Sequence, residues 1–222
     1  MEKLTPKSKQ KIINYIQRLD PKGELVTKLA PNKDWEGGTI EYNKSKLKLH
    51  REISQLNDEE YVRAYLVIKL VRELMYASEY VELEKEYEAG RPKVIKPRID
   101  MIVKTEDRQS TFLFIEAKSP DKYEQDKSYI EGQLFKLAQL EGGSGKVKYL
   151  VYYSVYEELQ DKTLIIDFPA NKTYEDWMLN GFVSLDRLPK EYGIARKAVY
   201  ANKDSSELEV GEKNLDRKVS KE

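Results

Sequence analysis

Two apolar segments of the sequence carry charged residues in a pattern that suits catalysis. The first is RIDMIV at residues 98–103, which contains Asp100, and the second is TFLFIEAKSP at residues 111–120, which contains Glu116 and Lys118. Side chains on a strand alternate between its two faces, so Glu116 and Lys118 point to the same side. An unpaired charge is strongly disfavoured in an apolar core. If the segments form a hairpin, we expect Asp100 to meet this pair at an edge of the sheet.

Two carboxylates beside one ammonium favour metal-dependent chemistry. Oxygen ligands suit a hard cation such as Mg²⁺, which keeps several waters and takes one or two carboxylates from a protein. A lysine beside the metal can help to deprotonate a water, or can stabilise the charge that develops on a phosphate. The three groups therefore favour hydrolysis of a phosphodiester, which needs neither cysteine nor histidine.

Composition excludes several other kinds of site. The chain of 222 residues has no cysteine, which removes disulfides, zinc–cysteine sites, iron–sulfur clusters and thiol nucleophiles. Its single histidine, His50, lies in a charged amphipathic stretch and is expected at the surface or half-buried, so histidine-based catalysis is disfavoured. Acidic and basic residues balance at 39 each, which gives no overall sign of nucleic-acid binding. Because no signal-peptide core and no membrane-length apolar run is present, we expect a cytoplasmic protein without a membrane partner.

The elements that must position these residues follow from apolar periodicity and from turn residues. In chain order they are a helix over 5–19, short strands near 25–29 and 39–42, a buried helix over 58–75, strands at 80–87, 98–104 and 111–118, a helix over 125–140, strands at 146–155 and 163–168, and a helix within 173–182. The order from residue 58 predicts an α/β fold with a central mixed sheet flanked by helices and an αβββαβ core.

Three regions of different character are expected along the chain. Residues 1–56 are predicted to be a helical and irregular appendage, and residues 57–168 to be the core that holds the candidate site. Residues 169–222 are expected to form a C-terminal helix and a polar connector that leads toward another domain.

The charged motifs, in this order of elements, resemble the PD-(D/E)xK nuclease superfamily. The residues that carry the resemblance are RID at 98–100 and IEAK at 115–118. More narrowly, the chain is similar to the N-terminal endonuclease domain of type I restriction enzyme R subunits and of single-chain restriction-modification proteins. In those proteins the first helix opens with a pattern like EEYVR at 59–63. The resemblance covers roughly residues 57–160.

This resemblance implies a restriction-endonuclease-like fold that cleaves double-stranded DNA with Mg²⁺, for which Mn²⁺ can substitute. Carried over residue by residue, it implies that Asp100 and Glu116 are metal ligands and that Lys118 is the catalytic lysine. It also implies Glu60 as a further acidic metal ligand and Gln133 as a group that positions the DNA or the site. The implied partners are other domains or subunits of a restriction-modification complex, which supply methyltransferase, specificity and helicase functions.

Two positions depart from the pattern of the family. Pro97 stands three residues before Asp100, whereas the family proline often precedes the aspartate directly. The glutamine motif of type I enzymes ends in tyrosine four residues later, and that position is Leu137 here, which puts the role of Gln133 in doubt.

Structural alternatives remain open for several of these residues. Glu60 also completes a capping-box pattern with Asn57. Glu116 and Lys118 would form an ordinary salt bridge if their strand faced solvent. Basic residues near the motifs form either a phosphate-binding rim or a solvated surface; they are Arg91, Lys93, Lys96, Arg98, Lys118, Lys122 and Lys127. At the level of function, the alternatives are a catalytically silent scaffold for DNA or subunit binding and a stand-alone repair nuclease.

Overall fold

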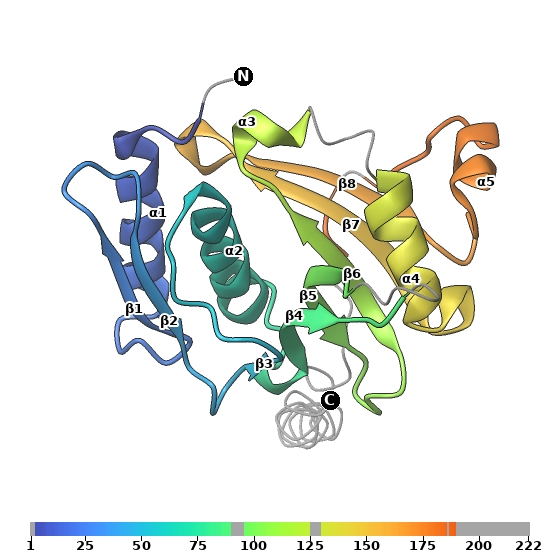
Figure 1. Cartoon of the computed structure of the whole chain (residues 1–222), viewed down its shortest axis with the longest axis horizontal. Coiled ribbons are helices and arrows are strands. Elements are labelled where there is room, and N and C mark those ends of the chain that lie inside the picture. Colours follow the sequence, from blue (N-terminus) through green and yellow to red (C-terminus); the bar gives the residue numbers. More distant parts are fainter. Residues whose placement is uncertain (1–2, 90–95, 125–129, 186, 190–222) are drawn as a thin grey trace, which may run out of the picture.

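The computed structural model describes residues 3–89, 96–124, 130–185 and 187–189 (Figure 1). The helices are α1 (Pro6–Leu19), α2 (Asp58–Ile68), α3 (Pro120–Tyr123), α4 (Lys136–Leu140) and α5 (Tyr174–Leu179). The strands are β1 (Val26–Pro31), β2 (Gly38–Tyr42), β3 (Lys48–Leu49), β4 (Val81–Glu86), β5 (Arg98–Lys104), β6 (Thr111–Ala117), β7 (Val147–Val155) and β8 (Asp161–Asp167). Two π-helical turns, Lys69–Glu73 and Glu131–Phe135, adjoin α2 and α4.

A six-stranded mixed sheet forms the centre of the molecule, in the order β3-β4-β5-β6-β7-β8, and β1 pairs with β2 in a separate hairpin. The β4–β5, β5–β6 and β7–β8 pairs are antiparallel, whereas β3–β4 and β6–β7 are parallel. The chain passes through α3 and α4 between β6 and β7, because parallel neighbours need a crossover connection. The predicted α/β class, with a mixed sheet flanked by helices, is confirmed.

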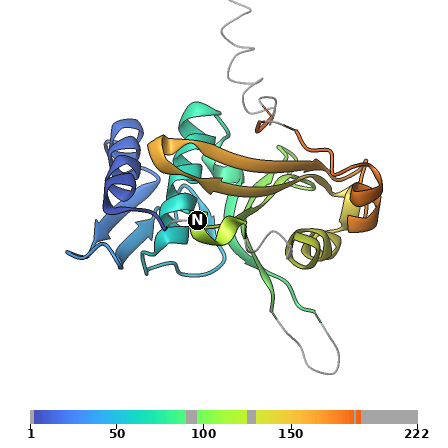
Figure 2. The same ribbon diagram turned by 90° about the horizontal axis from the view of Figure 1, so that it is seen from above.

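Helices cover both faces of this sheet. Figures 1 and 2 show α1, α2 and the β1–β2 hairpin on one side of the sheet, with α4 and α5 on the other. Because strand residues alternate between faces, Met101 and Ile115 join the core that includes α2, whereas Ile102 and Phe114 join the core that includes α4. The sheet therefore separates two hydrophobic clusters.

The N-terminal segment shares the larger of these clusters. Ile12 of α1 and Ile40 of β2 are buried in the same cluster as Leu66 of α2. The short strand β3 adds to the sheet by pairing in parallel with β4. Residues that precede α2 therefore contribute directly to the core that supports the sheet.

The structure modifies some of the predicted elements. The helix predicted over 58–75 is α-helical only to Ile68 and continues as the π-helical turn. Of the helix predicted over 125–140, residues 125–129 lie outside the described residues, and the remainder is a π-helical turn followed by α4. The last predicted helix is shorter than expected and ends at Leu179. The connector after residue 189 lies outside the described residues. Within the part of the chain that the structure describes, no helix combines the length and apolar character needed to cross a bilayer.

Candidate functional site

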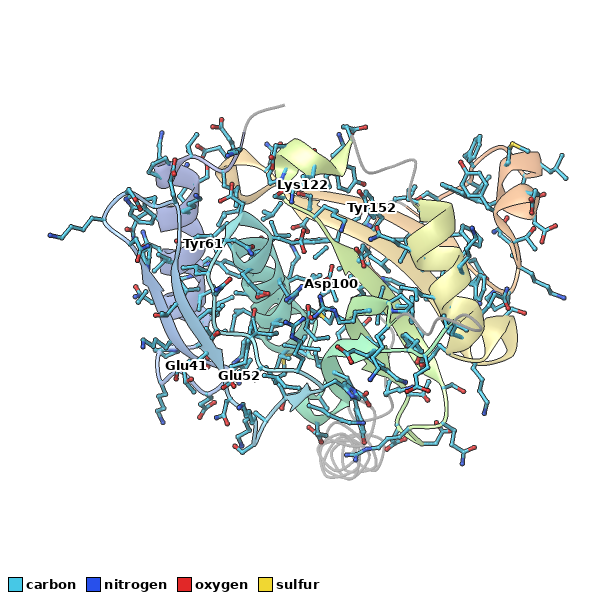
Figure 3. All side chains as sticks on the ribbon, viewed as in Figure 1. Glu41, Glu52, Tyr61, Asp100, Lys122 and Tyr152 are labelled. Atoms are coloured by element: carbon cyan, nitrogen blue, oxygen red, sulfur yellow. The ribbon has the colours of Figure 1, made fainter. Side chains whose placement is uncertain are left out.

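The candidate site lies where β5 begins and β6 ends. Met101 of β5 pairs with Ile115 of β6, and extending this antiparallel register by one residue sets Asp100 opposite Glu116. Figure 3 shows Asp100 near the middle of the molecule, between α2 and α4. Both strands are interior members of the sheet. The two carboxylates therefore meet at the ends of interior strands, which β4 and β7 flank on either side.

The Asp100 carboxylate is anchored through both of its oxygens. Its Oδ2 accepts a hydrogen bond of 2.8 Å from the backbone N–H of Ala117, which stands between Glu116 and Lys118. Its Oδ1 accepts a hydrogen bond from Nη2 of Arg63 on α2. The carboxylate thus joins the first helix of the predicted core to the strand that carries the Glu-x-Lys motif.

Glu116 and Lys118 form a salt bridge, but a buried one. Lys118 Nζ lies 2.6 Å from Glu116 Oε1, and the two residues are only 8% and 3% exposed. Burial raises the pKa of Glu116, and the nearby Asp100 raises it further. Burial acts to lower the pKa of Lys118, but the carboxylates of Glu116, Glu59 and Asp100 together outweigh burial and raise that pKa. Because both residues are buried, the open alternative of a solvated surface pair does not describe this site.

Glu60 contributes only half of the predicted capping box. The Asn57 side chain caps α2 by accepting a hydrogen bond of 2.9 Å from the Glu60 N–H. The Glu60 carboxylate bonds to Nη1 of Arg63, one turn further along the helix. Burial raises the pKa of Glu60 to about 7 in spite of Arg63, and Asp100 adds to the effect. Glu60 therefore faces the site, but it reaches Asp100 through Arg63.

Four of the five predicted site residues line one cavity of about 390 Å³. Its lining comprises Glu59, Arg63, Glu84, Lys96, Pro97, Arg98, Asp100, Glu116, Lys118, Gln133 and Leu137. Gln133 enters from the π-helical turn that precedes α4, a feature often found at functional sites. Leu137, four residues after Gln133, also lies at this cavity. Glu60 is the predicted site residue that does not belong to the lining.

Only some of the basic residues named from the sequence lie at this cavity. Lys96 and Arg98 line it together with Lys118, whereas Lys122 lines a different cavity of about 490 Å³. Arg91, Lys93 and Lys127 lie outside the described residues.

Sequence reasoning missed two residues of the site, Arg63 and Glu84. Arg63 Nη2 lies 2.8 Å from Glu84 Oε1, and Arg98 Nη1 lies 2.9 Å from Glu84 Oε2. A signal for Arg63 was present, because a charged residue inside an almost wholly apolar helix must find partners. Glu84 gave no such signal, because it belongs to a run in which acidic residues alternate with apolar ones.

Residues 58–151 match the family model for the type I restriction enzyme R protein N terminus. This match covers under half of the chain and runs from the first residue of α2 into β7. It includes all five predicted site residues as well as Arg63 and Glu84. No curated protein matched the chain.

The donor groups in this R-protein-like segment fit a hard cation. In the described part of the chain, Glu116 Oε2 and Glu60 Oε2 are buried oxygens without a hydrogen-bond partner, and a cation would satisfy such an atom. Nowhere in the described part of the chain do three or more histidine, aspartate or glutamate side chains form a group that could hold one metal ion. An ion at Asp100 and Glu116 would therefore take two protein carboxylates and fill its remaining positions with water or substrate oxygens, as Mg²⁺ commonly does.

Proposed function

We propose that this chain contains a Mg²⁺-dependent DNA endonuclease domain of a cytoplasmic restriction-modification enzyme, of the PD-(D/E)xK type, in which Mn²⁺ can replace Mg²⁺. The observation that carries this proposal is the meeting of Asp100, Glu116 and Lys118 in one cavity. The similarity of residues 58–151 to the R protein N terminus supports it.

In this proposal the chain's own residues divide the work of hydrolysis. Asp100 and Glu116 hold the ion through carboxylate oxygens. When bound, Mg²⁺ would supply Lewis-acid chemistry that activates a water and offsets phosphate charge. The protonated Lys118 stabilises the negative charge that develops on the phosphate as water oxygen bonds to phosphorus. The phosphorus–oxygen bond to the leaving deoxyribose then breaks, and that oxygen takes a proton.

The described lining of the cavity offers few basic groups for binding DNA. Lys96 and Arg98 at the cavity can contact phosphates, but the chain has zero formal net charge. We therefore propose that other domains or subunits, which carry specificity, methyltransferase and helicase functions, bring the double-stranded DNA to this site. Fluorescence anisotropy on the chain alone should give sequence-independent binding with a Kd of about 10⁻⁶ M or weaker at physiological salt. Tight sequence-specific binding would contradict this division of labour.

Nicking of supercoiled plasmid with Mg²⁺ or Mn²⁺ tests the proposal. We expect the unaltered chain to nick the plasmid, and Asp100→Asn and Lys118→Met to abolish nicking. Lys148→Met and Asp167→Asn are matched controls, because these residues form an ion pair of 2.9 Å outside the cavity lining. Both controls should cleave normally, and thermal unfolding confirms that each variant is folded.

Two other results would remove the proposal. Equal cleavage by the unaltered chain and by both site variants would assign the activity to a contaminant or to another site. Failure of the folded chain to cleave in complex with its partner subunits would favour the reading in which the fold serves as a silent scaffold.

A further inference from the structure

Arg63 is a buried cation surrounded by carboxylates. Its Nη2 lies 2.8 Å from Glu84 Oε1 and also contacts Asp100 Oδ1, while its Nη1 contacts Glu60 Oε1. The residue is only 4% exposed. The planar fork of a guanidinium can bond several carboxylates in fixed directions, which an ammonium cannot do. The guanidinium therefore sets the relative positions of three acidic side chains that come from α2, β4 and β5.

Glu84 takes part in this arrangement with an unfavourable backbone conformation. Its φ of +58° lies in the left-handed region, which is unfavourable for a residue with a side chain. Such conformations persist where surrounding contacts hold them, and they cluster at functional sites. The contacts here are Arg63 on one carboxylate oxygen and Arg98 on the other. The cluster is thus held in place from several directions.

The net negative charge of the buried groups at the site is the charge that one divalent ion would balance. The buried groups are the carboxylates of Glu60, Glu84, Asp100 and Glu116 and the cations of Arg63 and Lys118. With all of them ionised, two negative charges remain in excess. The less buried lining groups add one negative charge from Glu59 and two positive charges from Lys96 and Arg98. If Arg63 were absent, the excess among the buried groups would rise to three. Glu60 and Asp100 would lose this counter-charge, and Glu84 would keep only Arg98.

We propose that Arg63 is a positioning residue that serves as the built-in cation of the site. It fills the space between Glu60, Glu84 and Asp100, holds the Asp100 carboxylate by Oδ1, and so confines a divalent ion to the side of Asp100 that faces Glu116. The domain then works with one divalent ion, and Glu60 and Glu84 act on the site through Arg63. This inference rests on the proposed nuclease function.

Titration of the full chain with Mn²⁺ by isothermal titration calorimetry tests the proposal. The unaltered chain should bind one ion. Arg63→Met, which removes the charge at similar length, should bind a second ion, and Mn²⁺ should raise the Tm of this variant more than that of the unaltered chain. Plasmid cleavage should fall by about 10- to 100-fold, because Asp100 loses an anchor. Arg63→Lys should return the stoichiometry to one ion while restoring cleavage only in part.

Arg72→Met is a matched control for the loss of an ion-paired arginine. Arg72 Nη2 contacts Asp20 Oδ1 at 2.9 Å and Glu24 Oε2 at 2.7 Å, and none of these residues lines the cavity. This variant should bind one Mn²⁺ and cleave like the unaltered chain. A second ion in this control would show that the gain does not depend on the site, and would overturn the proposal.

The remaining outcomes separate the two proposals. If the unaltered chain binds no Mn²⁺, the proposed function fails. If it binds one ion and Arg63→Met binds one ion with the same affinity, the role of Arg63 is overturned while the function stands. Should Arg63→Met not fold, the double variant Arg63→Gln/Glu84→Gln removes one charge of each sign. It should bind one ion but cleave at least about tenfold more slowly, and normal cleavage would refute the positioning role.

Discussion

At the scale of single residues, Glu84 joins a functional side chain to an unfavourable backbone conformation. Its left-handed φ falls inside β4, between the paired residues Leu83 and Lys85. The strain turns the carboxylate toward Arg63 and Arg98, where it lines the cavity. Backbone strain at this position is thus coupled to the arrangement of charge.

Glycine and alanine substitutions at Glu84 separate these two effects. Both remove the carboxylate, but only glycine relieves the left-handed conformation, which costs roughly 1–2 kcal/mol for a residue with a Cβ. We expect Glu84→Gly to be more stable to urea than Glu84→Ala by about 1 kcal/mol. Equal midpoints for the two variants would show that the backbone relaxes once the carboxylate is gone.

The sequence allowed part of the site to be predicted. Asp100, Glu116 and Lys118 stood out because charges interrupt apolar strands, and the structure places all three at one cavity. Arg63 and Glu84 could not be placed in the same way. Their role depends on a helix crossing the end of a sheet, and on a left-handed residue that no glycine marks in the sequence.

At the scale of elements, Glu141 fastens the end of α4 to three strands. Its Oε2 lies 2.5 Å from Lys85 Nζ of β4, its Oε1 contacts Lys104 Nζ of β5, and Oε1 also accepts a hydrogen bond of 2.7 Å from the Thr111 hydroxyl of β6. Burial acts to raise the pKa of Glu141, but these hydrogen bonds outweigh it and lower the pKa to about 2.

This lowered pKa predicts how stability depends on pH. The ordinary pKa of 4.5 applies to the unfolded chain, so the stabilisation by Glu141 is complete above that pH and is lost as the pH falls toward 2. Glu141→Gln should lower the free energy of unfolding at pH 7 by about 2 kcal/mol, because it leaves the half-buried ammonium groups of Lys85 and Lys104 without a charged partner. The difference between this variant and the unaltered chain should shrink below pH 4.5. A difference that stays constant from pH 7 to pH 3 would contradict this account.

Elements with a strong local pattern were the ones predicted well. The strands at 98–104 and 111–117 follow directly from their apolar runs. The two-residue strand β3 was missed because its pairing with β4 links segments far apart in the chain and has no local signature. The π-helical turn after Ile68 was missed for a different reason. Apolar residues keep a helical spacing through this turn, so the sequence pattern does not distinguish it from an α-helix.

At the scale of the whole molecule, residues that precede α2 hold the start of that helix in place. Lys9 of α1 is buried, lies 2.7 Å from Asp58 Oδ1 at the start of α2, and donates a hydrogen bond of 2.7 Å to the Trp35 carbonyl. These contacts fix the end of α2 from which Glu60 and Arg63 reach the site.

Removal of residues 1–56 should therefore disturb more than the N-terminus. The truncation exposes the apolar face of α2 and removes β3 from the sheet. We expect the shortened chain to lose cooperative thermal unfolding, as followed by near-ultraviolet circular dichroism. A sharp transition at the original Tm would show instead that residues 57–168 fold as an independent unit.

The hydrogen bond between the Ala117 N–H and Asp100 has a consequence for how the site can be observed. An amide held by a buried carboxylate exchanges its hydrogen slowly, and the rate depends on how often that bond opens. Because Ala117 stands between Glu116 and Lys118, the exchange of its amide reports on the backbone that links the acidic and basic groups. Asp100→Ala should speed its exchange at least about tenfold without a matching change at Leu113, deep in the same strand, and nuclear magnetic resonance can follow both amides in the absence of DNA and metal.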